Sequence, residues 1–205
     1  MKKIISLLII AVMTVLSLTS CGNKVRTKIT EEEWDALNDI TNYTCNVKGT
    51  YYEFALGTRH RYGYTDTTKV TENAKQYSSQ YKNDPETTVY YCFSESGEAY
   101  RVSMSNDGAW EAKASKWTPR SLLGYITNNE VEFDDLTYNW KTKAYTCTVK
   151  DDDCVATYTY YFEEGKLAKA EMRYFEENDD GYVEDVTFSN LGTTTIALPE
   201  YTVKD

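Results

Sequence analysis

Four glycine-ended tripeptides interrupt runs of alternating apolar and polar residues, and their spacing constrains the fold more than any other feature of the chain. They are Glu95-Ser96-Gly97, Asn106-Asp107-Gly108, Glu163-Glu164-Gly165 and Asp179-Asp180-Gly181. A three-residue hairpin loop needs a left-handed residue at its end, and glycine adopts that conformation without steric cost. The tripeptides therefore predict four antiparallel hairpins.

The loop positions also predict which residues face each other across each hairpin. The predicted pairs are Cys92 with Tyr100, Tyr90 with Val102, Met104 with Trp110, Val102 with Ala112, Tyr100 with Ala114, Tyr160 with Ala168, Tyr158 with Ala170, Ala156 with Met172, Cys154 with Tyr174, Met172 with Phe188 and Tyr174 with Val186. Apolar residues meet in every pair, and a one-residue slip would move them all to the other face. We therefore expect a long meander with one apolar and one polar face.

A first helix is expected to begin after Thr30 and to cover part of that apolar face. Thr30 and Glu33 have the spacing of a capping box. Trp34, Leu37 and Ile40 then form one apolar stripe. This stripe is suited to packing on a sheet.

A second helix is expected after Thr118 and Pro119, which read as a cap followed by proline at the first helical position. Its apolar residues are Leu122, Leu123, Tyr125 and Ile126. Asn128-Asn129 is expected to end it. The polar stretch from residue 58 to 82 has weak periodicity and permits no assignment.

The N-terminus has the form of a cleaved lipoprotein signal peptide. Lys2 and Lys3 precede a thirteen-residue, largely apolar run, 4–16, which is shorter than the roughly 20 residues that span a membrane. The following Leu18-Thr19-Ser20-Cys21 resembles the bacterial lipobox, which implies lipid on the Cys21 thiol and cleavage before it. Two or three acyl chains anchor a protein stably, since each buried methylene contributes about 0.8 kcal/mol. The alternative is an ordinary secretory signal with a chance cysteine.

Length and charge then set the domain organisation. Residues 1–20 are the expected signal peptide, residues 21–29 a lipidated tether, and residues 30–205 one folded domain. Loss of Lys2 and Lys3 leaves 20 basic against 32 acidic residues, a net charge near −12. This acidity argues against binding nucleic acid or anionic headgroups by charge. We expect a monomer on the outer face of the cell membrane, or at the outer membrane of a diderm host because Gly22 follows Cys21.

The whole pattern resembles the LolA/LppX-like lipoproteins. It combines a lipobox, a helix, a long antiparallel sheet interrupted by a short helix, and a closing segment. That segment, residues 187–199, reads Thr-Phe-Ser-Asn-Leu-Gly-Thr-Thr-Thr-Ile-Ala-Leu-Pro. The resemblance implies an α+β, mostly antiparallel fold: a curved, unclosed half-barrel with two or three short helices over a concave face that can hold acyl chains. The 19 tyrosines of this chain predict a more polar concave face than an acyl-chain pocket prefers.

Four cysteines remain in the expected domain: Cys45, Cys92, Cys147 and Cys154. An even count outside the cytoplasm allows disulfides, with three possible connectivities. If Lys150 and Asp151 form a two-residue turn, Cys147 lies opposite Cys154, so this pair is the candidate bridge. The alternative is that all four are small buried apolar residues.

Residues that would indicate catalysis or metal binding are sparse. His60 is the single histidine and has neither a Gly-x-Ser-x-Gly serine nor a nearby cysteine, so we interpret it as solvent-facing. The acidic stretches 151–153 and 176–180 lack the bidentate glutamate of an EF-hand loop. No cysteines have zinc-site spacing. We therefore predict no catalytic residue, no metal and no cofactor.

The leading functional hypothesis is non-enzymatic binding or carrying of an amphipathic or lipid-like ligand on the concave face. Candidate cavity-lining residues are Trp34, Leu37, Leu122, Tyr125, Ile126, Tyr158, Met172 and Phe188. The alternative is an envelope module with a fully packed core that binds protein or glycan; Trp110, Trp117, Trp140, Tyr158 and Tyr160 are aromatic residues that stack on sugars or form core. A hydrolase would need a cleft of carboxylates with perturbed pKa values.

Overall fold

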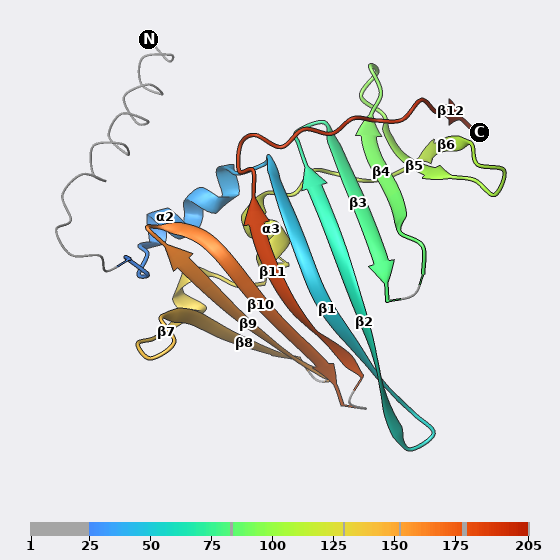
Figure 1. The fold of residues 1–205 in the computed structure, drawn as a ribbon. Coiled ribbons are helices and arrows are strands. Elements are labelled where there is room, and N and C mark those ends of the chain that lie inside the picture. The colour runs from blue at the N-terminus through green and yellow to red at the C-terminus, as the bar shows by residue number, and fades with distance from the viewer. Residues whose placement is uncertain (1–24, 83, 129, 152, 178–179, 205) are drawn as a thin grey trace, which may run out of the picture.

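The computed structural model describes residues 25–82, 84–128, 130–151, 153–177 and 180–204, which form one curved sheet that does not close (Figure 1). The predicted signal peptide and Cys21 lie outside these ranges. The strands within them are β1 (Tyr43–Ala55), β2 (Thr58–Val70), β3 (Ala74–Tyr81), β4 (Thr87–Phe93), β5 (Ala99–Met104), β6 (Trp110–Ala114), β7 (Thr137–Asn139), β8 (Ala144–Asp151), β9 (Cys154–Glu163), β10 (Lys166–Glu176), β11 (Gly181–Ser189) and β12 (Thr202–Val203). The helices are α2 (Glu31–Asp35), η1 (Ala36–Asp39), α3 (Leu122–Thr127) and η2 (Phe133–Asp135).

The sheet consists of two antiparallel meanders, β1 to β6 and β7 to β11, which join where β1 pairs with β11. The strand order is β12-β6-β5-β4-β3-β2-β1-β11-β10-β9-β8-β7. β12 pairs parallel with β6, whereas the other neighbours are antiparallel. This mostly antiparallel, unclosed sheet with a few short helices confirms the predicted half-barrel class.

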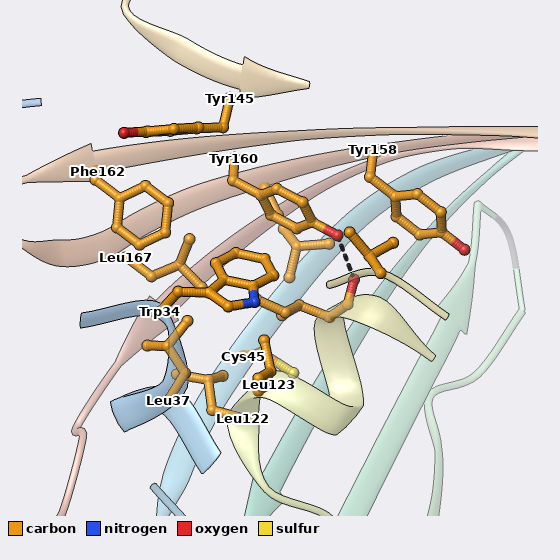
Figure 2. Packing of buried hydrophobic residues seen from close by; sticks show 14 of the residues in the cluster. Trp34, Leu37, Cys45, Leu122, Leu123, Tyr145, Tyr158, Tyr160, Phe162 and Leu167 are labelled. Atoms are coloured by element: carbon orange, nitrogen blue, oxygen red, sulfur yellow. Dashed lines mark hydrogen bonds between the residues drawn. The ribbon is translucent and has the colours of Figure 1, made fainter. Parts of the chain in front are cut away.

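The helices pack on one face of the sheet, which we call the helix face. Trp34 of α2 is 1% exposed and lies edge-on to Tyr160 of β9, with ring centroids 5.1 Å apart (Figure 2). The Tyr160 hydroxyl donates to the Ile126 carbonyl of α3 at 3.1 Å. The same cluster extends from Val70 on β2 to Tyr145 on β8, so the sheet curves around the helices. Burial of such side chains contributes about 1.5–3 kcal/mol each.

Both predicted helices are present, and one begins later than expected. Thr30 and Glu33 form the predicted capping box at the start of α2. The second helix, α3, begins at Leu122 with Ser121 as its N-cap, so the prediction of Thr118 as the cap was wrong. The Ser121 hydroxyl accepts an N–H of the first turn at 3.1 Å, because it directly precedes the apolar run.

The first two hairpins have the predicted register. Cys92 pairs with Tyr100, and Met104 pairs with Trp110. Gly97 and Gly108 both have positive φ, as the loop type requires. The two tripeptide loops therefore set these pairings as predicted.

The third and fourth hairpins are displaced from the predicted register by two and four residues. Tyr160 pairs with Ala170 rather than Ala168, and Met172 pairs with Glu184 rather than Phe188. In the third hairpin Glu164 and Gly165 both have positive φ and form a two-residue turn, which a bulge between Leu167 and Lys169 follows. Both displacements are even, so the side chains beyond the bulge keep their predicted face. Before the bulge, Leu167 pairs with Phe162 and is buried on the helix face, where Ala168 was predicted.

The prediction of one continuous apolar face was wrong, because β4, β5 and β6 bury the opposite face. Their apolar residues are Tyr90, Cys92, Tyr100, Val102, Trp110 and Ala112. Tyr91, next to Cys92, pairs with Lys75, which pairs with Val70 of the helix face. Since adjacent residues point to opposite faces, Cys92 points away from the helices. The change occurs across β2 and β3, in the stretch whose weak periodicity permitted no assignment.

A C-terminal strap, residues 190–204, covers this other face, which we call the strap face. Figure 1 shows it crossing the ends of the central strands to reach β6. The Thr194 N–H donates to the Asn42 side chain at 2.7 Å. Ile196 and Tyr201 then pack on the cluster around Cys92. The segment that the sequence resemblance singled out therefore ends β11 and forms most of the strap.

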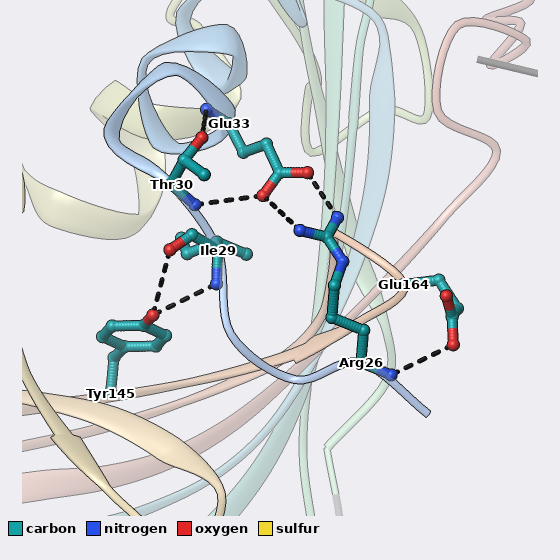
Figure 3. Close-up of polar contacts among 6 residues, drawn as sticks. All are labelled: Arg26, Ile29, Thr30, Glu33, Tyr145 and Glu164. Carbon is teal, nitrogen blue, oxygen red and sulfur yellow. Dashed lines mark hydrogen bonds and ion pairs between the residues drawn. The ribbon is translucent and has the colours of Figure 1, made fainter. Parts of the chain in front are cut away.

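Residues 26–29, within the predicted tether, lie against the β8–β10 end of the sheet (Figure 3). The Arg26 backbone N–H donates to the Glu164 carboxylate at 3.0 Å, and the Glu164 N–H donates back to the Arg26 carbonyl at 2.8 Å. The Arg26 guanidinium pairs with Glu33 and lowers the pKa of that carboxyl. Tyr145 bonds both the N–H and the carbonyl of buried Ile29. The chain is thus fixed to the sheet from Arg26 onward.

Candidate functional site

Two rows of side chains cross the helix face beyond the area that the helices cover. Directly opposed residues of antiparallel strands point to the same face, so the pairing defines each row. From β2 to β10 the outer row is Tyr62, Tyr51, Tyr182 and Tyr174. From β3 to β9 the inner row is Tyr81, Tyr64, Gly49, Glu184, Met172 and Tyr158. We call these the tyrosine rows; the outer one spans three strand spacings, about 14 Å.

Exposure separates these rows from the packed core beside them. Tyr51, Tyr62 and Tyr81 are 38%, 46% and 51% exposed. Tyr160, two residues from Tyr158 along β9, is fully buried under the helices. The tyrosine rows are therefore accessible at their β1–β3 end, whereas Tyr158 at the other end of the inner row is buried with the core.

Gly49 allows a tyrosine to lie across β1 within the inner row. A Cβ at Gly49 would fall 2.1 Å from Cζ of Tyr64, so the ring occupies the space of the missing side chain. The Tyr64 hydroxyl thereby reaches over β1 and donates to the Glu184 carboxylate on β11. Burial raises the pKa of Glu184, and burial also raises the pKa of Tyr64.

Asp66 lies next to the inner row and has an unsatisfied acceptor. Its Oδ2 accepts the Tyr77 hydroxyl at 2.9 Å. Its Oδ1 is buried and has no hydrogen-bond partner among the residues that the structure describes. Burial and then the charge of Asp66 raise the pKa of the Glu184 carboxyl.

The outer row combines stacked rings with a cavity at its β2 end. Tyr174 and Tyr182 stack with centroids 5.3 Å apart and an interplanar angle of 15°. A cavity of about 390 Å³ opens where β3 ends beside the longer β2. Its lining is Tyr51, Arg61, Tyr62, Gly63, Tyr81, Lys82 and Asp84. Aromatic walls with a few polar groups are typical of small-molecule sites.

The predicted cavity-lining residues come together, but most of them fill the core. Trp34, Leu37, Leu122, Ile126 and Tyr158 are buried in the helix-face cluster. The remaining three, Tyr125, Met172 and Phe188, are partly buried against it. Of the eight, Met172 and Tyr158 belong to a tyrosine row.

The predicted Cys147–Cys154 bridge is not formed. Cys154 pairs with Asp151, and Cys147 pairs with Tyr158, so the two cysteines are displaced by four residues along the hairpin. That offset is about 13 Å, whereas a disulfide needs Cα atoms within about 7 Å. Cys45, Cys92, Cys147 and Cys154 are all free, and the first three are buried, as the alternative interpretation proposed.

The other candidates from the sequence form no site in the part of the chain that the structure describes. His60 is exposed on β2 opposite Glu53. No three His, Cys, Asp or Glu side chains among these residues gather at metal-binding geometry. None of the helices described is long and apolar enough to cross a membrane.

Sequence reasoning missed the tyrosine rows because three of their members lie on β2 and β3. Tyr62, Tyr64 and Tyr81 fall in the unassigned stretch, and only the register aligns them with Tyr51 and Tyr182. Gly49 was a signal that could have been read, since a glycine inside a strand often marks close approach of another group.

Comparisons with known proteins yield a likeness to several solved structures, of which two are given as examples. One is a DUF1329 family protein from Desulfovibrio piger, with a TM-score of 0.32 and 8% identity, covering 82% of this chain and 93% of that chain. The other is a putative outer membrane lipoprotein-sorting protein domain from Vibrio parahaemolyticus, with a TM-score of 0.29 and 9% identity. The match covers 78% of this chain and 88% of that chain. No protein-family model and no curated protein match the chain.

Proposed function

We propose that this chain is an extracytoplasmic lipoprotein, anchored through lipid on Cys21, that binds an amphipathic ligand across the tyrosine rows. The observation that carries the proposal is the exposed set of tyrosines on the helix face, beyond the helices. A tyrosine ring offers apolar area and a hydroxyl, so a row of rings suits a ligand with one apolar and one polar side. The role is binding rather than catalysis.

The polar groups beneath the rings support such a ligand. The unpartnered Oδ1 of Asp66 is an acceptor, and a buried acceptor gains from a ligand donor. Arg61 and Lys82 line the cavity at the β2 end and suit the polar part of the same molecule. The filled core under the helices supports a ligand on the rows rather than an acyl chain under α2 and α3.

The test is native mass spectrometry of the full chain extracted from its membrane in mild detergent. The wild type should retain a co-purifying lipid or amphiphile. The triple variant Tyr51→Ala, Tyr62→Ala, Tyr182→Ala should lose it, because three of the four rings of the outer row are then removed. Tyr161→Ala is the matched control, since Tyr161 lies on the opposite face of β9, where its hydroxyl contacts Glu171. Equal retention by the wild type and the triple variant contradicts the proposal.

A second candidate is an envelope module that binds glycan or protein, which the densely packed core favours. Tyrosine rings also stack on sugars, and Arg61, Lys82 and Asp84 supply hydrogen-bonding groups at one end. Titration with soluble cell-wall oligosaccharides distinguishes the candidates. Saturable heat release that the triple variant loses, together with an apo mass for the wild type, supports this second function.

A further inference from the structure

The turn between β7 and β8 presents a large exposed aromatic residue on a rigid loop. Trp140 is 73% exposed. Asn139 holds the loop, because its side-chain oxygen accepts the Lys141 N–H at 2.9 Å and its carbonyl accepts the Lys143 N–H at 2.7 Å. Tyr138 fixes the indole with an edge-on contact, centroids 5.1 Å apart. Tryptophan is highly buried on average, so a rigidly presented, exposed indole indicates a contact surface.

One cation contacts this indole and two more lie on its loop, although the chain as a whole is acidic. The Lys28 ammonium lies 4.0 Å from the centre of the Trp140 ring. Lys141 and Lys143 belong to the same loop and are exposed. The acidic residues of η2 lie at the other end of β7. There burial, and then the charge of Asp135, raise the pKa of the Cys147 thiol. We call Lys28, Trp140, Lys141 and Lys143 the lysine–tryptophan turn.

The chain that leads to the predicted anchor is fixed to the sheet from Arg26 onward, two residues before Lys28 reaches this turn. Lys28 connects the two directly, because it lies in the N-terminal segment and touches Trp140. Lys28 is seven positions after Cys21, and an extended chain of that length spans at most about 25 Å. A membrane that holds the acyl chains of Cys21 is therefore within that distance of the lysine–tryptophan turn.

We propose that the lysine–tryptophan turn docks on the headgroup layer of the membrane that carries the anchor. Tryptophan rings favour the boundary between headgroups and acyl chains. Each lysine near an anionic surface contributes about 1 kcal/mol, over a range of about a Debye length. The overall charge argues against adsorption of the whole molecule, whereas a local set of three cations beside the anchor acts at short range.

Docking sets the orientation of the domain. The turn and the segment 26–29 lie at one end of the strands, and the loop between β1 and β2 lies at the other (Figure 1). The tyrosine rows lie between the helices and the loop that joins β1 to β2. They are therefore on the side of the domain away from the membrane. The inference rests on the anchor of the proposed function but not on the ligand.

The test measures contact between Trp140 and lipid directly. The full chain is produced with its lipid, then reconstituted in vesicles of phosphatidylethanolamine and phosphatidylglycerol with brominated acyl chains. Bromine quenches only indoles at the bilayer boundary, so the wild type should show a quenched component. Trp140→Phe should lose that component. Trp117→Phe is the control and should keep it, because Trp117 packs on Phe93 in the other meander. Lys141→Gln with Lys143→Gln should weaken the quenching.

The results distinguish failure of the lipid anchor on Cys21 from failure of the docking surface. Vesicle-bound wild type and Trp140→Phe with the same quenching overturn the docking surface while the anchor stands. If the chain carries no acyl group, the anchor fails, and soluble chain is added to the same vesicles. Quenching that depends on Trp140 then still supports docking, and its absence overturns it.

Discussion

Two parts of one sheet bury their apolar side chains on opposite faces. The β7–β11 meander, together with β1, buries large rings under helices, as with Trp34 on Tyr160. The β4–β6 strands bury small residues, such as Cys92 and Ala112, under the C-terminal strap. Among the residues described, the helix-face cluster has twenty buried apolar members and the strap-face cluster has four.

This difference shows that the alternation of apolar and polar residues sets the pairing within each hairpin. It does not set whether two hairpins bury their apolar residues on the same face of the sheet. Cross-strand pairs keep like residues together within a hairpin. Which face two hairpins share depends on residues between them, here β2 and β3. The meander with the larger core is expected to contribute most of the stability, and variants in the two clusters measure the contrast.

The largest expected effect is in the helix-face cluster. Trp34→Ala should lower the free energy of unfolding by about 3–5 kcal/mol, because it leaves a cavity between Tyr160 and Phe162. Urea denaturation followed by circular dichroism measures the loss. Trp110→Ala, which removes a half-buried indole from the strap-face cluster, should cost less. Equal losses would contradict the ranking of the two clusters.

The next effect lies on β1, in the inner tyrosine row. Gly49→Ala should cost about 1–3 kcal/mol, because the new methyl displaces Tyr64 and breaks its bond to the Glu184 carboxylate. Gly63→Ala is the matched control, since a Cβ there meets nothing within 4 Å. Its unfolding free energy should stay within about 0.5 kcal/mol of the wild type. Urea denaturation again provides the readout.

A smaller loss is expected when the strap loses its main ring. Tyr201→Ala should cost about 1–2 kcal/mol and expose the Cys92 thiol, whose sulfur lies 3.6 Å from the Tyr201 hydroxyl. Mass spectrometry after iodoacetamide labelling should find Cys92 modified in this variant and protected in the wild type. Tyr201→Phe keeps the ring and should keep the protection. Protection in Tyr201→Ala would show that the strap does not cover this cluster.

A pH effect should come from Glu184. Burial raises its folded pKa above the ordinary glutamate value, so its protonated form favours the folded state. Its contribution is complete below the unfolded pKa and is lost as pH rises through the folded pKa. The unfolding free energy of Glu184→Gln relative to the wild type should therefore increase as pH rises from about 4. A difference that stays flat with pH would contradict the burial of this carboxyl.

The smallest effect is expected at the Arg26–Glu33 ion pair, whose side chains are 49% and 31% exposed. Glu33→Gln keeps the capping box and removes the charge, so it should cost about 0.2–1 kcal/mol at neutral pH. Arg26 lowers the pKa of Glu33, so this contribution is present above the unfolded pKa and is lost as pH falls through the folded pKa. Thermal unfolding at pH 7 and pH 3 measures it; Glu31→Gln, outside the ion pair and the capping box, is the control.

Much of the local structure could be predicted from residues close together in the chain. Thr30 and Glu33 cap α2, and the loops ending at Gly97 and Gly108 set their hairpins. Even where Glu164 enters a two-residue turn, the displaced register keeps the predicted face of the residues beyond the bulge. Of the candidate site, Tyr158 and Met172 were predicted, and both lie in the inner row.

What the sequence by itself determined is therefore the alternation within each hairpin, because strand geometry and turn sterics act over a few residues. The tertiary structure decided which faces the two meanders share, where the helices stop, and that Tyr64 lies over Gly49 to reach Glu184. Those outcomes depend on contacts between residues far apart in the chain. Their free energies are set by how volumes fit together rather than by a repeating pattern.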